Sequence, residues 1–226
     1  MISVLGVDAC VRGWVGVELH DGRFAAAHVG RALVDVICAA PDAAAIVAVD
    51  IPLGLVESGW RKADSAAKTV LGARSSTLFM MPPRAALAAD THAGATARCR
   101  ELTGNGFSIQ AWGLKAKLLE ANSLYDSGRY PLREVHPEVS FIRMGLRAAD
   151  GSKKTWRGQR GRLRVLRAHG IELPDEVGRA GTVPTDDLLD AAAAAWSAHR
   201  IACGEGQSLP DPPQRNRVGQ QIAIWF

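Results

Sequence analysis

The chain has 226 residues, of which 47% are hydrophobic and 22% are charged, and its formal net charge at pH 7 is +4. This length suits one large domain, or one domain with a sizeable insertion, and the apolar fraction suffices to bury a core. No run of 18 apolar residues lacks a charge, so no membrane span is expected. The mild basic excess is compatible with a polyanionic partner such as nucleic acid.

The cysteines and the first residues indicate a cytoplasmic protein. Cys10, Cys38, Cys99 and Cys203 form no Cys-x-x-Cys pair and are expected to be reduced thiols. The opening residues, MISVLGVDAC, have no basic region followed by a long apolar run. They predict a strand rather than a signal peptide.

Apolar patterning and turn residues predict the elements of the first 51 residues. The segment at 45–51 (AIVAVDI) is almost wholly apolar, as in a strand of a parallel or mixed sheet that helices cover on both faces. The predicted elements, in chain order, are strands at 2–8, 13–19 and 23–29, a helix at 31–39, a break at Pro41 and Asp42, and the strand at 45–51.

Residues 52–128 differ in character, because Pro- and Gly-containing breaks separate segments of helical periodicity, and they predict a mostly helical insertion. The later elements are expected as helices at 60–71, 84–101 and 109–127, a strand at 132–136, a polar loop at 148–161, a basic helix at 157–169, a Pro/Gly-rich connection at 172–184, a helix at 185–203 and a strand at 219–226. The pattern as a whole predicts an α/β fold, a mixed sheet flanked by helices, in a single domain spanning residues 1–226.

Three acids stand on separate apolar strands: Asp8, Asp50 and Glu134. Strands of one sheet bring their ends to one edge, where open α/β sheets place their sites, so these acids are expected to meet. For each acid alone, a polar residue where a strand reaches solvent is the favoured explanation. That explanation is weaker for Asp8 and Asp50 together, because both follow buried strands and neither has a basic neighbour.

The helix at 185–203 supplies two further acids on one face, Asp187 and Asp190, followed by five alanines at 191–195. The alanines allow tight packing on a sheet. Favourable interaction with the helix dipole explains Asp187, but Asp190 lies in the second turn and needs another partner. Clustered carboxylates without a His or Cys cage suit Mg²⁺ or Mn²⁺, and two such ions can drive phosphodiester hydrolysis.

The segment EVHPE offers a second set of polar residues around Pro137, which fixes a turn. Glu134 is a candidate metal ligand or base, and His136 a candidate contact to phosphate or water. The alternative is a strand end with a local Glu–His contact.

Residues 152–167 (SKKTWRGQRGRLRVLR) contain seven cations and no acid. Uncompensated cations repel one another, which favours a track for a phosphate backbone with Trp156 stacking on a base; the alternative is a solvated helix face. The predicted nucleic-acid contacts are Lys153, Lys154, Arg157, Arg160 and Arg164. Arg84 and Lys115, in the insertion, are candidate substrate contacts of a lid, or ordinary surface cations.

Taken together, these motifs resemble the RNase H-like superfamily, and RuvC-type resolvases in particular. More closely, the chain resembles the family called domain of unknown function 429, described as predicted RNase H-like nucleases. The resemblance covers nearly the whole chain and rests on GVDACVRGWVGVEL (6–19), VAVDIPLGL (47–55), MPPR (81–84), QAWGLKAKLLE (110–120), EVHPEVSF (134–141), SKKT (152–155) and DDLLDAAAAAW (186–196).

The resemblance implies that acids on the first strand, the fourth strand and the last helix bind two metal ions. Ala9 stands where many members have Gly, and the first helix offers only Asp35 where RNase H proper has a Glu, so the RuvC-like layout fits better. The expected activity is therefore a nuclease that holds two Mg²⁺ or Mn²⁺ ions with Asp8, Asp50, Asp187 and Asp190 and acts on DNA or RNA.

Two alternatives stay open. A non-catalytic nucleic-acid-binding protein could keep this fold with structural acids. An actin-like or sugar-kinase-like phosphotransferase would need Gly and Thr or Ser after the first acid, and usually two such domains. Here residues 9–12 read Ala-Cys-Val-Arg and the chain is short.

Overall fold

The computed structural model describes residues 1–40 and 43–226, so the break predicted at Pro41 and Asp42 lies outside the described residues. The chain forms two compact units: residues 1–51, 130–207 and 225–226 make the first, and residues 52–129 and 208–224 make the second.

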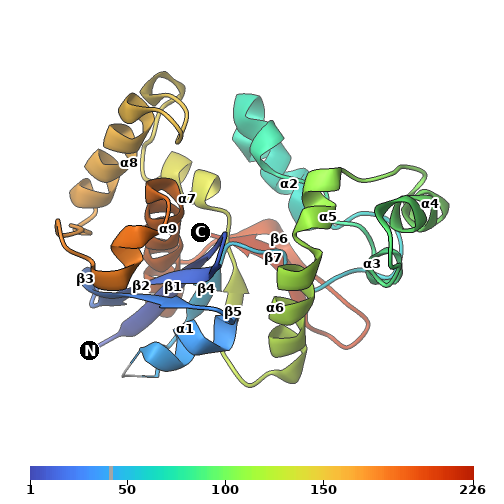
Figure 1. Ribbon diagram of the computed structural model, residues 1–226, viewed down its shortest axis with the longest axis horizontal. Helices are drawn as coiled ribbons and strands as arrows, with labels where there is room; N and C mark the ends of the chain where they lie inside the picture. The colour runs from blue at the N-terminus through green and yellow to red at the C-terminus, as the bar shows by residue number, and fades with distance from the viewer. Residues whose placement is uncertain (41–42) are drawn as a thin grey trace. The chain divides into compact units, whose positions relative to one another are not determined.

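The first unit is built on a five-stranded sheet of order β3-β2-β1-β4-β5 (Figure 1). The first three strands are antiparallel neighbours, and β1, β4 and β5 run parallel. Its elements are β1 (Ser3–Cys10), β2 (Gly13–His20), β3 (Arg23–Gly30), α1 (Leu33–Ala39), β4 (Val47–Val49), β5 (Leu132–Glu134), α7 (Pro137–Arg143), η2 (Ala148–Asp150), α8 (Trp156–Ala168), η3 (Gly178–Thr182) and α9 (Thr185–Ala202). The predicted mixed α/β architecture is confirmed, and it is consistent with an RNase H-like fold.

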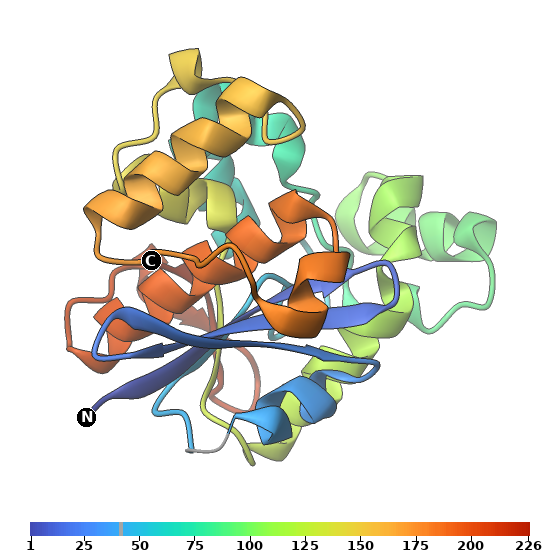
Figure 2. The ribbon, with the colours of Figure 1, turned by 60° about the vertical axis from the view of Figure 1, so that its left-hand side comes forward.

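Helices cover both faces of this sheet, with α9 on one face and α1 on the other (Figure 2). Because side chains alternate along a strand, Val4, Gly6 and Asp8 face α9, whereas Leu5 and Val7 face α1. A Cβ atom at Gly6 would lie 1.9 Å from the backbone nitrogen of Ala195. The alanine face of α9 therefore rests directly on β1, as its small side chains predict.

The second unit consists of helices and a two-stranded sheet. Its elements are α2 (Lys62–Leu71), η1 (Gly72–Thr77), α3 (Arg84–Leu87), α4 (His92–Thr103), α5 (Ile109–Gly113), α6 (Lys115–Ser127), β6 (Ser208–Arg215) and β7 (Gln221–Trp225), of which only Trp225 belongs to the first unit. The sequence does not predict β6, because SLPDPPQR contains three prolines, which donate no ladder hydrogen bonds and are tolerated here in a strand with a single neighbour.

The single helices predicted at 84–101 and 109–127 are wrong, since each is divided in two. The Thr91 side chain accepts a hydrogen bond from the Gly94 nitrogen at 3.2 Å and thereby begins α4 as a separate helix. The second division falls at Leu114, directly after Gly113, a poor helix former.

Candidate metal centre

Asp8 and Asp50 lie side by side at the ends of neighbouring parallel strands. Val7 is in register with Val49, and the Asp50 backbone nitrogen donates a hydrogen bond to the Val7 carbonyl at 2.8 Å. Asp8 directly follows Val7, and Asp50 directly follows Val49. Both carboxylates therefore point to the face of the sheet that α9 covers.

Helix α9 adds the third carboxylate. Its backbone touches β1 at Gly6, where a Cβ atom would lie 2.3 Å from the Ala191 carbonyl oxygen, so Asp190 comes close to Asp8. One oxygen from each of Asp8, Asp50 and Asp190 lies within 4.8 Å of the other two. Asp190 is 1% exposed, Asp8 is 6% exposed and Asp50 is half-buried. The structure thus brings together three acids that are far apart in the sequence.

Burial and mutual repulsion make ionisation of this cluster costly. Burial raises the pKa of Asp8 well above its usual value, and the charges of Asp50 and Asp190 raise it further. Burial also raises the pKa of Asp50 to about 7 and that of Asp190 to about 7. The carboxylates must therefore share protons or gain positive charge from a partner.

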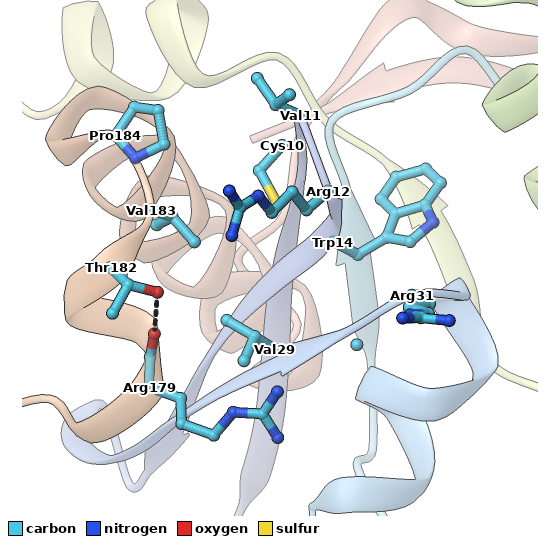
Figure 3. A pocket seen from close by; sticks show the side chains of 11 residues that line it. Cys10, Val11, Arg12, Trp14, Val29, Arg31, Arg179, Thr182, Val183 and Pro184 are labelled. Atoms are coloured by element: carbon cyan, nitrogen blue, oxygen red, sulfur yellow. Dashed lines mark hydrogen bonds between the residues drawn. The ribbon is translucent and has the colours of Figure 1, made fainter.

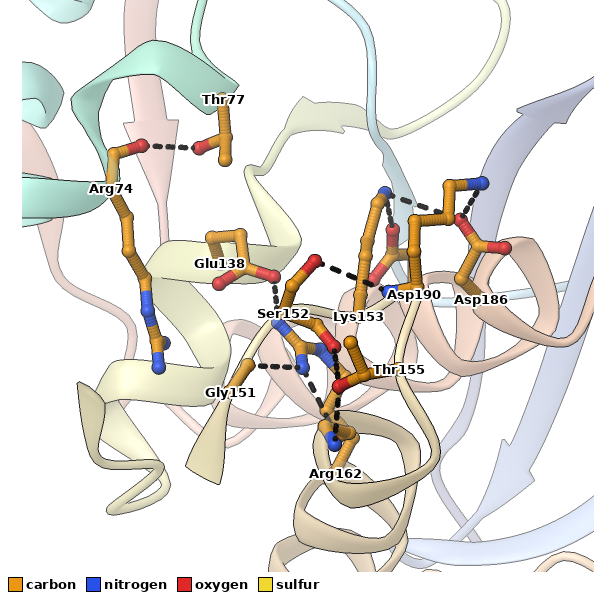
Figure 4. A network of polar contacts seen from close by, with 12 residues as sticks. Arg74, Thr77, Glu138, Gly151, Ser152, Lys153, Thr155, Arg162, Asp186 and Asp190 are labelled. Atoms are coloured by element: carbon orange, nitrogen blue, oxygen red, sulfur yellow. Dashed lines mark hydrogen bonds and ion pairs between the residues drawn. The ribbon is translucent and has the colours of Figure 1, made fainter. Parts of the chain in front are cut away.

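Lys153 supplies part of that positive charge. Its Nζ lies 2.5 Å from Asp190 Oδ2 and 3.7 Å from Asp186 Oδ2 (Figure 4). Burial lowers the pKa of the Lys153 ammonium, but the charge of Asp190, the hydrogen bond to it and the charges of Asp50 and Asp8 together outweigh burial, so the net shift is upward. The other oxygen of Asp190, Oδ1, is buried and accepts no hydrogen bond from the described residues. One ligand oxygen of the cluster is thus left for a cation.

The loop that carries Lys153 is fixed by its contacts with α8, which is in turn paired with α7. The Thr155 side chain accepts a hydrogen bond from the Gly158 nitrogen at 3.2 Å, which begins α8. A Cβ at Gly158 would lie 1.9 Å from the Ser152 carbonyl oxygen, so only glycine allows this approach. Arg162 is 1% exposed, donates to the Gly158 carbonyl at 3.1 Å and pairs with Glu138.

The expectation of seven uncompensated cations in residues 152–167 is wrong. The segment itself contains no acid, but acids outside it pair with five of its seven cations. These pairs are Lys153 with Asp190, Lys154 with Asp186 at 2.7 Å, Arg162 with Glu138, Arg164 with Asp150 at 2.9 Å and Arg167 with Glu172 at 2.5 Å. Within residues 1–40 and 43–226, Arg157 and Arg160 have no carboxylate partner, and Arg160 stacks 5.5 Å from the ring of the exposed Trp156.

Glu134 does not join the three clustered aspartates. Glu134 is on β5 and is in register with Val49 of β4, so its side chain leaves the sheet on the α1 face, opposite to Asp50. Glu138, four residues later, is the member of EVHPE whose charge raises the pKa values of Asp50 and Asp190. His136 begins α7, where its carbonyl oxygen accepts a hydrogen bond from the Val139 nitrogen at 2.9 Å.

Asp187 lies near the cluster without joining it. Its charge raises the pKa values of Asp8 and Asp50, but it is half-buried and outside the 4.8 Å group. It stands in the first turn of α9 together with Asp186. Its predicted role as a metal ligand stays a prediction.

Arg84 and Lys115 belong to the second unit, where both have partners. The Arg84 guanidinium lies 2.8 Å from Asp126 Oδ2. Lys115 Nζ donates to the Ala89 carbonyl at 2.6 Å and lies 4.6 Å from the centre of the Trp112 ring. Their expected contact with substrate stays a prediction.

A family model described as "Protein of unknown function (DUF429)" matches residues 6–215, which is most of the chain. The chain belongs to this family. No curated protein and no solved structure matches this DUF429 protein. Among its described residues, no helix combines the length and the apolar character needed to cross a membrane.

Proposed function

We propose that this DUF429 protein is an RNase H-like nuclease that hydrolyses phosphodiester bonds of DNA or RNA with two Mg²⁺ or Mn²⁺ ions. The observation that carries the proposal is the convergence of Asp8, Asp50 and Asp190 from β1, the end of β4 and α9 within 4.8 Å. In a RuvC-like layout these acids, with Asp187 beside them, would hold the ions. The free cysteines agree with action in the cytoplasm.

The residues present fit a hard divalent cation. All three donors are carboxylates, which Mg²⁺ and Mn²⁺ prefer, and the buried Asp190 Oδ1 lacks a hydrogen-bond donor among the described residues. Burial and repulsion raise the pKa values of all three, so a cation that relieves the repulsion gains binding energy there. When bound, the ions supply an activated water and neutralise charge on the phosphodiester.

The protein's own groups orient the site. Lys153 holds its proton on Nζ and donates to Asp190 Oδ2, which fixes the rotamer of that carboxylate. The Lys153 ammonium also offsets part of the negative charge that would repel a phosphodiester. Arg160 and Trp156, exposed on α8, present a cation and an aromatic face to a nucleic-acid strand.

A cleavage assay tests the proposal. Single strands, duplexes and branched junctions are incubated with Mn²⁺ or with EDTA, and Asp8→Asn is compared with Asp90→Asn, an exposed acid of the second unit. We expect cleavage in Mn²⁺ by the unaltered protein and by Asp90→Asn, and none by Asp8→Asn or in EDTA. Cutting by metal-free protein, or full activity of Asp8→Asn, would contradict the two-metal mechanism.

One observation favours the second candidate, a nucleic-acid-binding protein without catalysis. Lys153 lies 2.5 Å from Asp190, so an ammonium already neutralises one carboxylate. Calorimetry with Mn²⁺ separates the two, because a catalytic centre binds the ion whereas a structural ion-pair cluster does not. Nucleic-acid binding without Mn²⁺ binding would select the non-catalytic reading.

A further inference from the structure

A pocket of about 490 Å³ in the first unit gathers three arginines and no acid (Figure 3). It is lined by the turn between β1 and β2, the end of β3 and the segment that leads into α9. Each of these three regions contributes one cation, in the order Arg12, Arg31 and Arg179. Within the described part of the chain none of the three has an ion-pair or side-chain hydrogen-bond partner.

Backbone packing brings these three regions of the chain together. Gly13 has φ +143°, and a Cβ atom there would lie 2.0 Å from the Gly30 carbonyl oxygen and 2.8 Å from the Arg31 Cα. The glycine therefore lets the turn with Arg12 press against the chain at Arg31. Helix η3 packs on β3 and brings Arg179 to the same pocket.

Three arginines without a counter-charge favour a phosphate ligand. The planar guanidinium donates paired hydrogen bonds that match phosphate oxygens, and no carboxylate in the pocket competes for them. The remaining walls include Val29 and Val183, which are half-buried and provide apolar surface for a sugar or base. By contrast, Arg164 on α8 already pairs with Asp150.

The pocket adjoins the acid cluster through two shared elements. Cys10 lines the pocket and follows Asp8 by two residues on the same face of β1, about 7 Å along the strand. Pro184 lines it as well and immediately precedes α9, the helix that carries Asp190. The pocket and the acid cluster therefore share β1 and the start of α9 within the first unit.

We propose that the Arg12–Arg31–Arg179 pocket binds backbone phosphates of the nucleic-acid strand, close to the phosphodiester placed at Asp8, Asp50 and Asp190. This subsite rests on the proposed nuclease function.

The test measures binding in EDTA, where no cleavage occurs, so that it does not depend on activity. Fluorescence anisotropy with a labelled single-stranded oligonucleotide compares the unaltered protein with Arg12→Gln/Arg31→Gln/Arg179→Gln over a range of salt concentrations. Arg23→Gln is the matched control, because Arg23 is exposed, lies at the opposite end of β3 and has no ion pair among the described residues. All three pocket arginines are exposed, so the variant is expected to fold, and thermal melting checks this.

We expect the triple variant to bind the oligonucleotide about 10- to 100-fold more weakly, with a salt slope shallower by about 2, whereas Arg23→Gln binds normally. Equal affinity and slope in the triple variant, or no binding by the unaltered protein, would overturn the subsite. A parallel titration with a mononucleotide and with inorganic phosphate identifies the source of the phosphate. Binding of these small anions without the oligonucleotide would overturn the strand assignment.

Failure of the subsite is distinguishable from failure of the nuclease proposal. Normal oligonucleotide binding by the triple variant, with Mn²⁺-dependent cleavage by the unaltered protein, rejects only the subsite. Arginine-dependent binding without cleavage or Mn²⁺ binding rejects the metal centre and leaves a phosphate pocket.

Discussion

Two buried acidic centres lie on opposite faces of the five-stranded sheet. On the α1 face, Glu18 of β2 is 1% exposed and accepts hydrogen bonds from His20 Nε2 at 2.7 Å and His28 Nε2 at 2.9 Å. Each carboxylate oxygen of Glu18 thus has its own donor. Such a group is satisfied within the protein and needs no further partner.

On the α9 face the balance is reversed. Asp8, Asp50 and Asp190 bring three carboxylates together, and Lys153 is the ammonium in contact with Asp190. Burial and repulsion then raise the pKa values of all three acids. The comparison teaches that burial alone does not mark a functional carboxylate. The proposed metal site rests instead on an excess of acids over donors, because such an excess favours uptake of a cation.

The largest expected effect separates the two centres by activity. Asp190→Asn removes one charge from the cluster and should lower Mn²⁺-dependent cleavage by about a thousandfold or more, since metal binding and charge stabilisation contribute several kcal/mol. Glu18→Gln should change the cleavage rate by less than about twofold. Single-turnover rates of both variants measure this, and equal losses would remove the distinction between the centres.

The second effect separates them by stability. Glu18→Gln replaces a charged acceptor that serves two histidines and leaves buried groups imperfectly paired, at a cost of about 1–3 kcal/mol in the free energy of unfolding. Asp190→Asn, by relieving repulsion in metal-free protein, should cost less than Glu18→Gln. Urea denaturation in EDTA measures both; a larger loss for Asp190→Asn would show that the cluster is a structural ion-pair network.

The third effect depends on pH. Asp50 and Asp190 have pKa values of about 7 when folded, above the usual value of 3.8, so the folded state binds more protons than the unfolded state between these limits. The stability of metal-free protein should therefore fall as pH rises from about 5 to about 8. Mn²⁺ displaces protons, so it should raise Tm by several degrees more at pH 8 than at pH 5.5. A pH-independent Mn²⁺ effect in thermal melts would contradict a site built from these carboxylates.

The smallest expected effect concerns α8. Arg157 and Arg160 have no carboxylate partner among the described residues, so Arg157→Gln/Arg160→Gln should flatten the salt dependence of oligonucleotide binding by about 1. Arg162→Gln should instead lower stability, because Arg162 is buried against Glu138. Anisotropy titrations and urea denaturation separate the two outcomes. An unchanged slope in the double variant would show that this face of α8 contacts no phosphate.

Much of the fold follows from local sequence. Apolar patterning predicts the meander and the buried β4, and the small side chains of α9 predict its close packing on the sheet. The same patterns also predict that Asp8, Asp50 and Asp190 meet. What local patterns do not contain is strand register. Only register shows that Glu134, aligned with Val49, leaves the sheet on the opposite face from Asp50.

Local patterns also do not predict ion pairs between residues that are far apart in the sequence. A cationic segment without acids predicts uncompensated charge, although Lys153 pairs with Asp190, 37 residues away in the sequence. The feature of the sequence that indicates this pairing is the surplus of acids on the strands and α9, because a buried acidic cluster and a basic loop in one chain can neutralise each other. The pocket of Arg12, Arg31 and Arg179 has no sequence signature, since packing at Gly13 and η3 creates it.

The most direct test is a crystal of the protein soaked with Mn²⁺ and measured at the manganese absorption edge. The account predicts anomalous peaks bound by carboxylate oxygens of Asp8, Asp50 and Asp190, and none beside Glu18. No peak at the three aspartates, with Lys153 still paired to Asp190 at saturating Mn²⁺, would contradict it.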